Sequence, residues 1–345
     1  MFKFSDFNNS TVNEYYRGRK YDTTMIDRLF PMEKTPEMKV RNVNGAYGLP
    51  VAASIHAFDS TTQVASREPI RISEVDKQLV KKQIPTREEL IMELNDTNNP
   101  ITQSNVVKQL YNDVDLMVEA VLTRTRAMAM EALTTGHVTT KNDINLNSID
   151  IDYGLPAEHF EVLAGNNLWS ADTCDPIEDL TRWAGKLTDD GAEAPAYILA
   201  SRKVLSNLFR NANFKKAIMG TVLTRPLTRA EVNTFLEAQS LPKFVQFDQK
   251  YRVEDKAGKK TTIPYLPENK VVLLPNAAVG KSVFGPTPEE YELVNSPNLK
   301  ILAQQNVIIE VYKTPDPVAH WTKAVCTNIP SFDRADEVFI ATVTN

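Results

Sequence analysis

Cysteine is scarce in this chain of 345 residues, which has only Cys174 and Cys326, far apart in the sequence. Two isolated thiols provide neither a disulfide framework nor a zinc-binding pair, and they suit a protein that folds in a reducing cytoplasm. Long apolar runs are absent, since no stretch approaches the roughly 20 residues of a membrane helix. The opening MFKFSDFNNS lacks a continuous apolar segment, so we expect neither a signal peptide nor a membrane location.

A basic excess is also missing. Lys and Arg number 39 against 44 Asp and Glu, which gives a formal net charge of −5. Proteins that attract nucleic acid by bulk electrostatics usually carry a strong positive excess, so this balance argues against that class. A protein that only encloses DNA remains compatible with it. With 42% hydrophobic and 24% charged residues, the chain is expected to be globular with a sizeable core.

Signatures of metal binding are lacking. The sequence contains no HExxH and no Cys/His spacing typical of zinc sites, and its four histidines are scattered, at His56, His137, His159 and His320. The segment DINLNSIDIDYG begins like a calcium loop, but Ser148 replaces the required glycine and Gly154 the bidentate acid. We therefore expect no metal site.

Signatures of catalysis and nucleotide binding are lacking too. The segment VVLLPNAAVGKSVFGP resembles a strand followed by a phosphate-binding loop. Pro275, however, occupies the place of the first glycine, and Gly285 and Pro286 interrupt the helix that should follow. Adjacent acids such as Glu289 and Glu290 do not converge on one helix face. These patterns predict a structural turn and give no indication of an enzyme or a cofactor.

The strongest local signal is a long helix that starts near Asn99-Pro100. Asn is a good N-cap, and Pro suits the first helical position. Apolar residues then recur at steps of three and four as far as Leu133, and Gly136 supplies a left-handed stop. The stripe consists of Val107, Leu110, Val114, Met117, Val121 and Met128. A helix from Pro100 to Leu133 would be roughly 50 Å long, a rod that can support other elements.

A mixed helix and strand region follows. Asp175 before Pro176, with Glu178 at the capping-box position, predicts one helix start; Ser201 predicts a second, and Thr228 a third. Extended segments are expected at AYILA and VVLLP, and a β-hairpin from KFVQFDQKYRVED and TTIPYLP. Three more strands, NVIIEVY, TKAVCT and EVFIATV, are predicted near the end of the chain.

The first 85 residues contain little apolar mass. Residues 1–35 show no sustained periodicity, which predicts an arm that becomes ordered only on another surface. Residues 36–85 alternate around Val40, Val51 and Ile55, as a two-stranded ribbon does. Because a two-stranded ribbon is rarely stable by itself, this segment implies a partner surface.

In order and spacing, these pieces resemble the lambda gpE-like family of phage major capsid proteins, which has the Hong-Kong-97-type capsid fold. The segments that carry the resemblance are DRLFPMEKTPEMKV with LPVAASI, the helix ending in MAMEALTTGHV, DPIEDLTRWAGKL with APAYILASRKVLSNL, VVLLPNAAVGKSVFGP, and DPVAHWTKAVCTNIPSFDRADEVFIATV. Together they cover most of the chain.

The resemblance implies an α+β fold with five parts. These are an N-terminal arm (1–35), an extended loop or β-ribbon (36–85), a peripheral domain with a long spine helix (86–160), an α/β axial domain (161–305), and strands that return to the peripheral domain (306–345). It also implies a major capsid protein, not an enzyme, whose copies form the pentamers and hexamers of an icosahedral shell around phage double-stranded DNA.

Other expectations come with this resemblance. The partners would be further copies of the chain, a scaffolding protein, a portal and a decoration protein, with DNA enclosed without sequence specificity. The location would be the virion capsid, assembled in the cytoplasm of the bacterial host. The expected intersubunit contacts are Phe30, Val51, Ile55 and Arg67. The expected hinges for quasi-equivalent packing are Gly45, Gly48 and Gly136.

Two alternatives stay open. An encapsulin-like shell protein shares the fold class but encloses cargo proteins, so encapsulated cargo would distinguish it. An α/β enzyme with its site in residues 160–305 would have a polar cleft near the strand ends at Leu199 and Leu274, and the mass of a monomer or dimer. Covalent crosslinks join subunits in some capsids of this fold, but no residue here indicates one.

Overall fold

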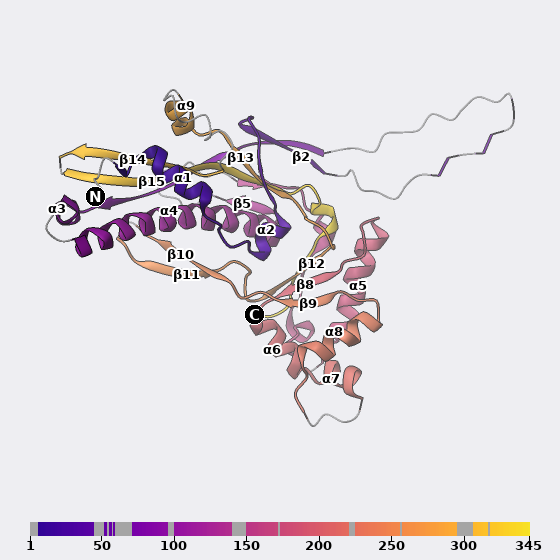
Figure 1. Cartoon of the computed structure of the whole chain (residues 1–345). Coiled ribbons are helices and arrows are strands. Elements are labelled where there is room, and N and C mark those ends of the chain that lie inside the picture. Colours follow the sequence, from indigo (N-terminus) through magenta and orange to yellow (C-terminus); the bar gives the residue numbers. More distant parts are fainter. Residues whose placement is uncertain are drawn as a thin grey trace. The chain divides into compact units, whose positions relative to one another are not determined.

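Each of the two units of the computed structural model is assembled from three separate segments of the chain (Figure 1). The segments of unit 1 are Met1–Val40, Glu74–Ala129 and Lys281–Ser331. Those of unit 2 are Arg41–Ser73, Met130–Gly280 and Phe332–Asn345. The structure describes residues 6–44, 52–53, 55–56, 58, 71–95, 100–139, 150–171, 173–220, 225–255, 257–294, 306–316 and 318–345.

The sheet of unit 1 is organised around the long strand β15 (Val318–Ser331). On one side β15 pairs with β4 (Gln78–Thr86), and on the other it pairs in succession with β14 (Ile308–Pro315) and β13 (Lys281–Gly285), all antiparallel. β1 (Met32–Lys34) adds to β13 in parallel. Two of the three predicted C-terminal strands, NVIIEVY and TKAVCT, are thereby confirmed as β14 and β15.

The predicted long helix is confirmed as α4 (Pro100–Thr135), which ends two residues beyond Leu133. Its apolar stripe packs against side chains of the unit 1 sheet, among them Phe284, Ile309 and Cys326. The helix contributes Val106, Leu110, Val114, Met117, Val118, Val121 and Leu122 to this core. The other helices of unit 1 are α1 (Asn9–Gly18), α2 (Met25–Leu29), α3 (Glu88–Asn95) and α9 (Pro288–Val294).

The N-terminal segment differs from the predicted arm that lies on another surface. Residues 6–35 fold onto unit 1 of their own chain, where Phe7, Val12 and Ile26 are buried. Asn8 caps α1, and Thr24 caps α2 with a complete capping box. Helices of 10 and 5 residues are too short to produce a recognisable periodicity, which is why the sequence suggested an irregular arm.

Unit 2 contains a second five-stranded sheet, in the order β7-β16-β12-β8-β9. The central strand β12 pairs antiparallel with β16 and β8, while the outer strands β7 and β9 run parallel to their neighbours. The bounds are β7 (Phe160–Val162), β8 (Tyr197–Ala200), β9 (Lys243–Gln246), β12 (Lys270–Leu274) and β16 (Phe339–Thr342). The predicted strands AYILA, VVLLP and EVFIATV are therefore confirmed.

Helices complete the core of unit 2, and three of their predicted starts are confirmed. Asp175, Ser201 and Thr228 each accept a hydrogen bond from the first turn of the helix that follows. Glu231 completes the predicted capping box of Thr228, whereas the N–H of Glu178 donates to Asp175. The helices are α5 (Pro176–Asp189), α6 (Arg202–Arg210), α7 (Ala212–Met219) and α8 (Arg229–Ala238).

Short strands and 3-10 turns lie outside the two five-stranded sheets. Three two-stranded sheets are formed by β2 (Lys39–Asn44) with β3 (Arg71–Asp76), β5 (His137–Thr139) with β6 (Asp150–Asp152), and β10 (Lys250–Glu254) with β11 (Lys260–Pro264). The predicted hairpin is thus confirmed as β10 and β11, while KFVQ forms the separate strand β9. Single 3-10 turns lie at Ala157–His159, Gly165–Asn167 and Ala335–Glu337.

The units divide the chain differently from the predicted parts at two places. The segment predicted as axial, 161–305, leaves unit 2 after Gly280, because β13 pairs with β15 in unit 1. The segment predicted to return to the peripheral part, 306–345, does so only as far as Ser331. Its last strand, β16, lies between β7 and β12 of unit 2.

Candidate functional site

Exposed apolar side chains lie in the segment between β2 and β3. Ile55 and Phe58 have relative exposures of 101% and 102%, more than any other large hydrophobic residue of the described chain. Burying such a side chain stabilises a protein by about 1.5–3 kcal/mol relative to leaving it in water. Neither side chain is buried within its own subunit, so burial against another copy would be stabilising. This segment is therefore the first candidate for an assembly contact.

A buried lysine fixes the chain directly after β3. The ammonium of Lys77 donates to the Thr35 hydroxyl at 2.6 Å and to the carbonyls of Glu37 at 2.6 Å and Phe284 at 3.0 Å. Lys77 is only 5% exposed, and this burial lowers the pKa of its ammonium against the opposing effect of Glu37. These bonds join β4 to β13 and to the link between β1 and β2.

Gly285 makes room for this lysine. A Cβ atom added at Gly285 would lie 2.7 Å from Cδ and 3.2 Å from Nζ of Lys77, closer than atoms pack. The same glycine belongs to the GKSVFG segment, which forms strand β13 and not the helix of a phosphate-binding loop. Its role within unit 1 is therefore to let a buried cation reach the carbonyl of Phe284.

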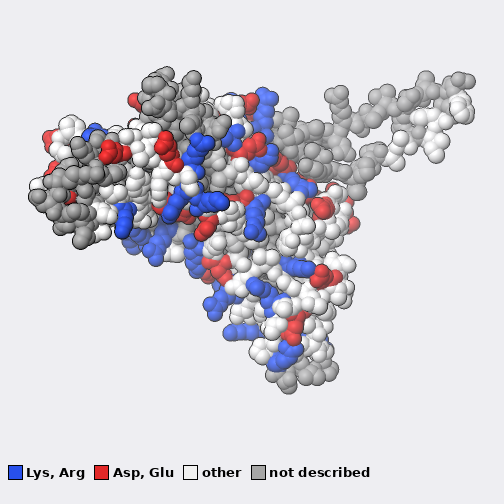
Figure 2. All heavy atoms as spheres, viewed as in Figure 1, with Lys and Arg blue, Asp and Glu red and all other residues white. Residues whose placement is uncertain are grey.

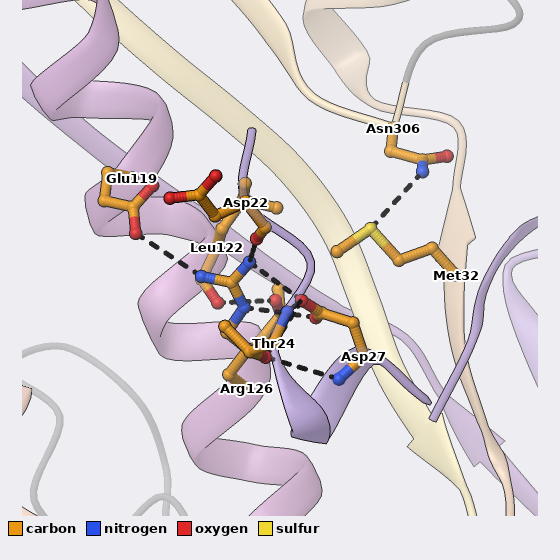
Figure 3. Close-up of polar contacts among 9 residues, drawn as sticks. Asp22, Thr24, Asp27, Met32, Glu119, Leu122, Arg126 and Asn306 are labelled. Atoms are coloured by element: carbon orange, nitrogen blue, oxygen red, sulfur yellow. Dashed lines mark hydrogen bonds and ion pairs between the residues drawn. The ribbon is translucent and has the colours of Figure 1, made fainter. Parts of the chain in front are cut away.

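A second buried ionic contact attaches the N-terminal segment to α4 (Figure 3). The guanidinium of Arg126 donates to both carboxylate oxygens of Asp27, at 3.1 and 2.9 Å, and to the carbonyl of Asp22 at 3.1 Å. The Arg126 and Asp27 side chains are 7% and 9% exposed. Asp27 also accepts from Thr24, so one carboxylate both caps α2 and binds the spine helix.

Ion pairs also hold the short helix α9 on unit 1. Lys34 pairs with Glu290 at 2.9 Å, and Lys323 pairs with Glu289 at 3.1 Å and with Glu310. Desolvation is the largest influence on the pKa of Lys323 and lowers it, but the hydrogen bonds to Glu310 and Glu289 outweigh it, so the pKa is raised. The adjacent acids of α9 are thus structural.

The histidines differ in their surroundings. Within the described residues, no cluster of three or more His, Cys, Asp or Glu side chains has the geometry to hold a metal ion. His159 bonds Asp190 at 2.8 Å. His320 is buried, and desolvation together with the charge of Lys313 lowers its pKa to about 4. His137 lies among acids at the surface.

Unit 2 has a groove of about 680 Å³ between α7 and α8. Ile218, Met219 and Phe235 supply apolar lining, and Arg225 and Glu231 pair with each other beside it. Among the described residues of its lining, these two are the titratable ones. On the face shown in Figure 2, Lys and Arg are spread out with Asp and Glu between them instead of gathering in one basic patch.

The residues predicted as contacts and hinges have different positions. Phe30 is fully buried inside unit 1, so its surroundings in the subunit do not support a contact with another copy. Ile55 is fully exposed. Gly136 has φ of +73° and ends α4, which confirms the predicted left-handed stop. Outside the described residues lie Val51, Arg67, Gly45 and Gly48.

No pattern in the sequence pointed to Lys77 or Arg126. Their partners lie far along the chain, 207 residues away for Phe284 and 99 for Asp27. Lys77 lies between Asp76 and Gln78, and Arg126 lies in a helix that also carries Arg124 and Glu131, so each cation looks like part of a solvated face. No helix among the residues that the structure describes could cross a membrane.

Comparison with known proteins agrees with this architecture. The family model described as phage major capsid protein E matches residues 13–343. A putative prophage capsid protein from Escherichia coli CFT073 has a similar structure, with a TM-score of 0.63, 13% identity, and coverage of 97% of this chain and 99% of that one. No curated protein matches the sequence.

A phage-related protein from Bordetella bronchiseptica RB50 is similar as well, with a TM-score of 0.56, 11% identity, and coverage of 96% of this chain and 95% of that one. At such low identities the two likenesses show a shared fold and nothing finer. The family match is of a different kind, because it extends over almost the whole sequence, from α1 to the residue that follows β16. This chain belongs to the phage major capsid protein E family.

Proposed function

We propose that copies of this chain assemble into pentamers and hexamers and close an icosahedral shell around phage double-stranded DNA. The observation that carries the proposal is the family match over residues 13–343. The net charge of −5 and the interspersed charges support enclosure of DNA without sequence-specific binding. We place the shell in the virion, with assembly in the bacterial cytoplasm.

The same proposal assigns the chain no catalytic role. Its partners, besides further copies, are a scaffolding protein, a portal and a decoration protein. Support for a structural role comes from the buried ionic groups, because Lys77, Arg126 and Lys323 each bind backbone or carboxylate groups of their own unit. Charged groups used in this way stabilise a subunit and are not available to a substrate.

Within this function, the segment between β2 and β3 contacts neighbouring subunits. Ile55 and Phe58 are its described apolar side chains, and both are fully exposed in the isolated chain. Val51 and Arg67 belong to the same segment and are proposed contacts with them. Gly136, and with it Gly45 and Gly48, are proposed hinges. The buried ammonium of Lys77 fixes the chain directly after β3, where this segment rejoins unit 1.

The test is assembly of a double variant, Ile55→Ser with Phe58→Ser, followed by light scattering and negative-stain electron microscopy. Wild-type chain, with a candidate scaffolding protein, is expected to give rings of five or six copies, tubes or closed shells. The double variant should remain a folded subunit or small ring that does not close, because its neighbours lose the apolar contact.

Val253→Ser is the matched control, since Val253 is also an exposed apolar residue, at 40%, but lies in β10. It should assemble as wild type does. Normal shells from the Ile55/Phe58 variant would refute the proposed contact while leaving the capsid role intact. A wild-type chain that stays monomeric or dimeric with every scaffolding candidate would refute the shell function itself.

A further inference from the structure

The outer edge of β14 is covered by helix α1, which lies beside it (Figure 1). Among the strands that the structure describes, β14 pairs with β15 along one side and with none along the other. In an antiparallel ladder, alternate residues direct their N–H and C=O groups away from the partner strand. In β14 these groups include those of Ile309 and Val311, which are bonded to side chains of α1. A strand edge of this kind would otherwise be open to another strand.

Two asparagines of α1 make three of the bonds that an added strand would make. The Asn13 amide donates to the carbonyl of Ile309 at 2.7 Å and accepts from its N–H at 3.2 Å. The side-chain oxygen of Asn9 accepts from the N–H of Val311 at 2.5 Å. The pair with Ile309 reproduces the reciprocal exchange of two hydrogen bonds that facing residues make in an antiparallel sheet.

The spacing of the two asparagines matches the strand. Four residues of an α-helix rise about 6 Å. Two residues of a β-strand extend about 6.6–6.8 Å, which is nearly the same length. Asn13 therefore reaches Ile309 while Asn9 reaches Val311, because two helical residues four positions apart are spaced like two strand residues two positions apart. Other helical spacings would leave one of the backbone groups without a bond.

The rest of the edge carries different obstacles to pairing. Lys313, the next residue with the same orientation, is exposed, and a lysine on an edge strand disfavours association. Pro315, the last, has no N–H to donate. Asn13 is 3% exposed and Val12 is fully buried, so the covering helix is packed firmly on unit 1. Each outward-facing residue of β14 is thus hydrogen-bonded to α1, charged, or a proline without an N–H group.

We propose that α1 guards this edge against pairing with β14 of a second copy of the chain. An antiparallel pair of identical strands is self-complementary about a two-fold axis, so the same edge can serve on both partners. Copies of a shell protein meet at high local concentration, and an open edge would join them in a geometry unrelated to the shell. This role goes beyond the proposed function, because it concerns an association that the subunit avoids.

The test uses the full chain with Asn9→Ala and Asn13→Ala. Alanine favours helix more than asparagine does, so α1 is expected to keep its helical form. Hydrogen exchange of residues 306–316 and light scattering are measured over a hundredfold range of concentration, without scaffolding protein. The wild-type amides of Ile309 and Val311 should be protected at every concentration. In the variant they should exchange freely when dilute and regain protection as dimers or longer oligomers form.

Glu14→Ala is the matched control, because Glu14 is an exposed residue of the same helix, and it should behave as wild type. A variant whose mass and protection equal those of wild type at all concentrations would overturn the proposal, as would free exchange without association.

If the double variant does not fold, Asn9→Ala with Lys313→Thr removes one bond and the edge charge but keeps the buried Asn13 pair. In that variant the Val311 amide should exchange faster than in wild type and association should appear at the highest concentrations; unchanged exchange and unchanged mass would overturn the proposal.

Discussion

At the scale of single residues, buried cations hold separate chain segments together. Arg126 is the clearest case, since one guanidinium binds the Asp27 carboxylate and the carbonyl of Asp22. Removal of one partner from a buried pair costs more than the pair contributes, because the other charge stays buried without compensation. The N-terminal helices therefore depend on a residue about a hundred positions away in the chain.

Arg126→Met is expected to lower the free energy of unfolding by about 3 kcal/mol. The reason is that Asp27, 9% exposed, would keep its charge without the guanidinium. Urea unfolding followed by circular dichroism measures the change. Glu119→Gln is the control, because Glu119 contacts the same guanidinium at 3.4 Å but is 55% exposed; its effect should stay below about 1 kcal/mol. Equal effects of the two substitutions would contradict the assignment.

At the scale of elements, the termination of α4 depends on Gly136. Its φ of +73° lies in the left-handed region, and its N–H bonds the carbonyl of Ala132 at 2.9 Å. A Cβ atom there would also approach Cβ of Leu155 to 3.1 Å. Gly185, in the middle of α5, has no such positive φ, and a Cβ atom there would meet nothing within 4 Å.

Alanine at these two glycines should therefore have opposite effects. Gly136→Ala is expected to lower the free energy of unfolding by about 1–2 kcal/mol, since an L-residue is strained in the left-handed region. Gly185→Ala should raise it by up to about 1 kcal/mol, because alanine favours helix more than glycine does. Thermal unfolding of both variants beside wild type measures the difference, and a shift of the same sign in both would contradict the explanation.

Elements with a local chemical signal were predictable from the sequence. The caps at Asp175, Ser201 and Thr228 and the stop at Gly136 each depend on residues within a few positions of one another, and all four are present. The helices α1 and α2 carry too few turns for periodicity to reveal them. They become ordered through contacts with α4 and β14, which no local pattern encodes.

At the scale of the whole molecule, β16 shows what sequence reasoning could not supply. The strand itself was expected from EVFIATV, but its place between β7 and β12 depends on pairings with residues about 70 and 180 positions earlier. The family resemblance supplied the correct fold class, whereas the placement of β16 in unit 2 was seen only in the structure. Sequence separation, not ambiguous local propensity, limited the prediction.

Deletion of Phe339–Asn345 is expected to abolish the folding of unit 2 and, with it, assembly. The deletion removes a strand with neighbours on both sides, and Phe339, Ile340 and Ala341 are all buried. Recovery in the soluble fraction and limited proteolysis of the soluble part measure the effect. Removal of Asn345 alone, an exposed residue, should be tolerated. A soluble, protease-resistant chain after the longer deletion would contradict this role of β16.

The interleaving of the two units has a consequence for synthesis on the ribosome. The sheet of unit 1 lacks its central strand until Val318–Ser331 has been made, and the sheet of unit 2 lacks an inner strand until Phe339–Thr342 follows. A nascent chain therefore cannot complete unit 1 before Ser331, or unit 2 before Thr342, has left the ribosome. Nascent chains shorter than this accordingly present neither unit in its complete form to a neighbouring chain on the same messenger RNA.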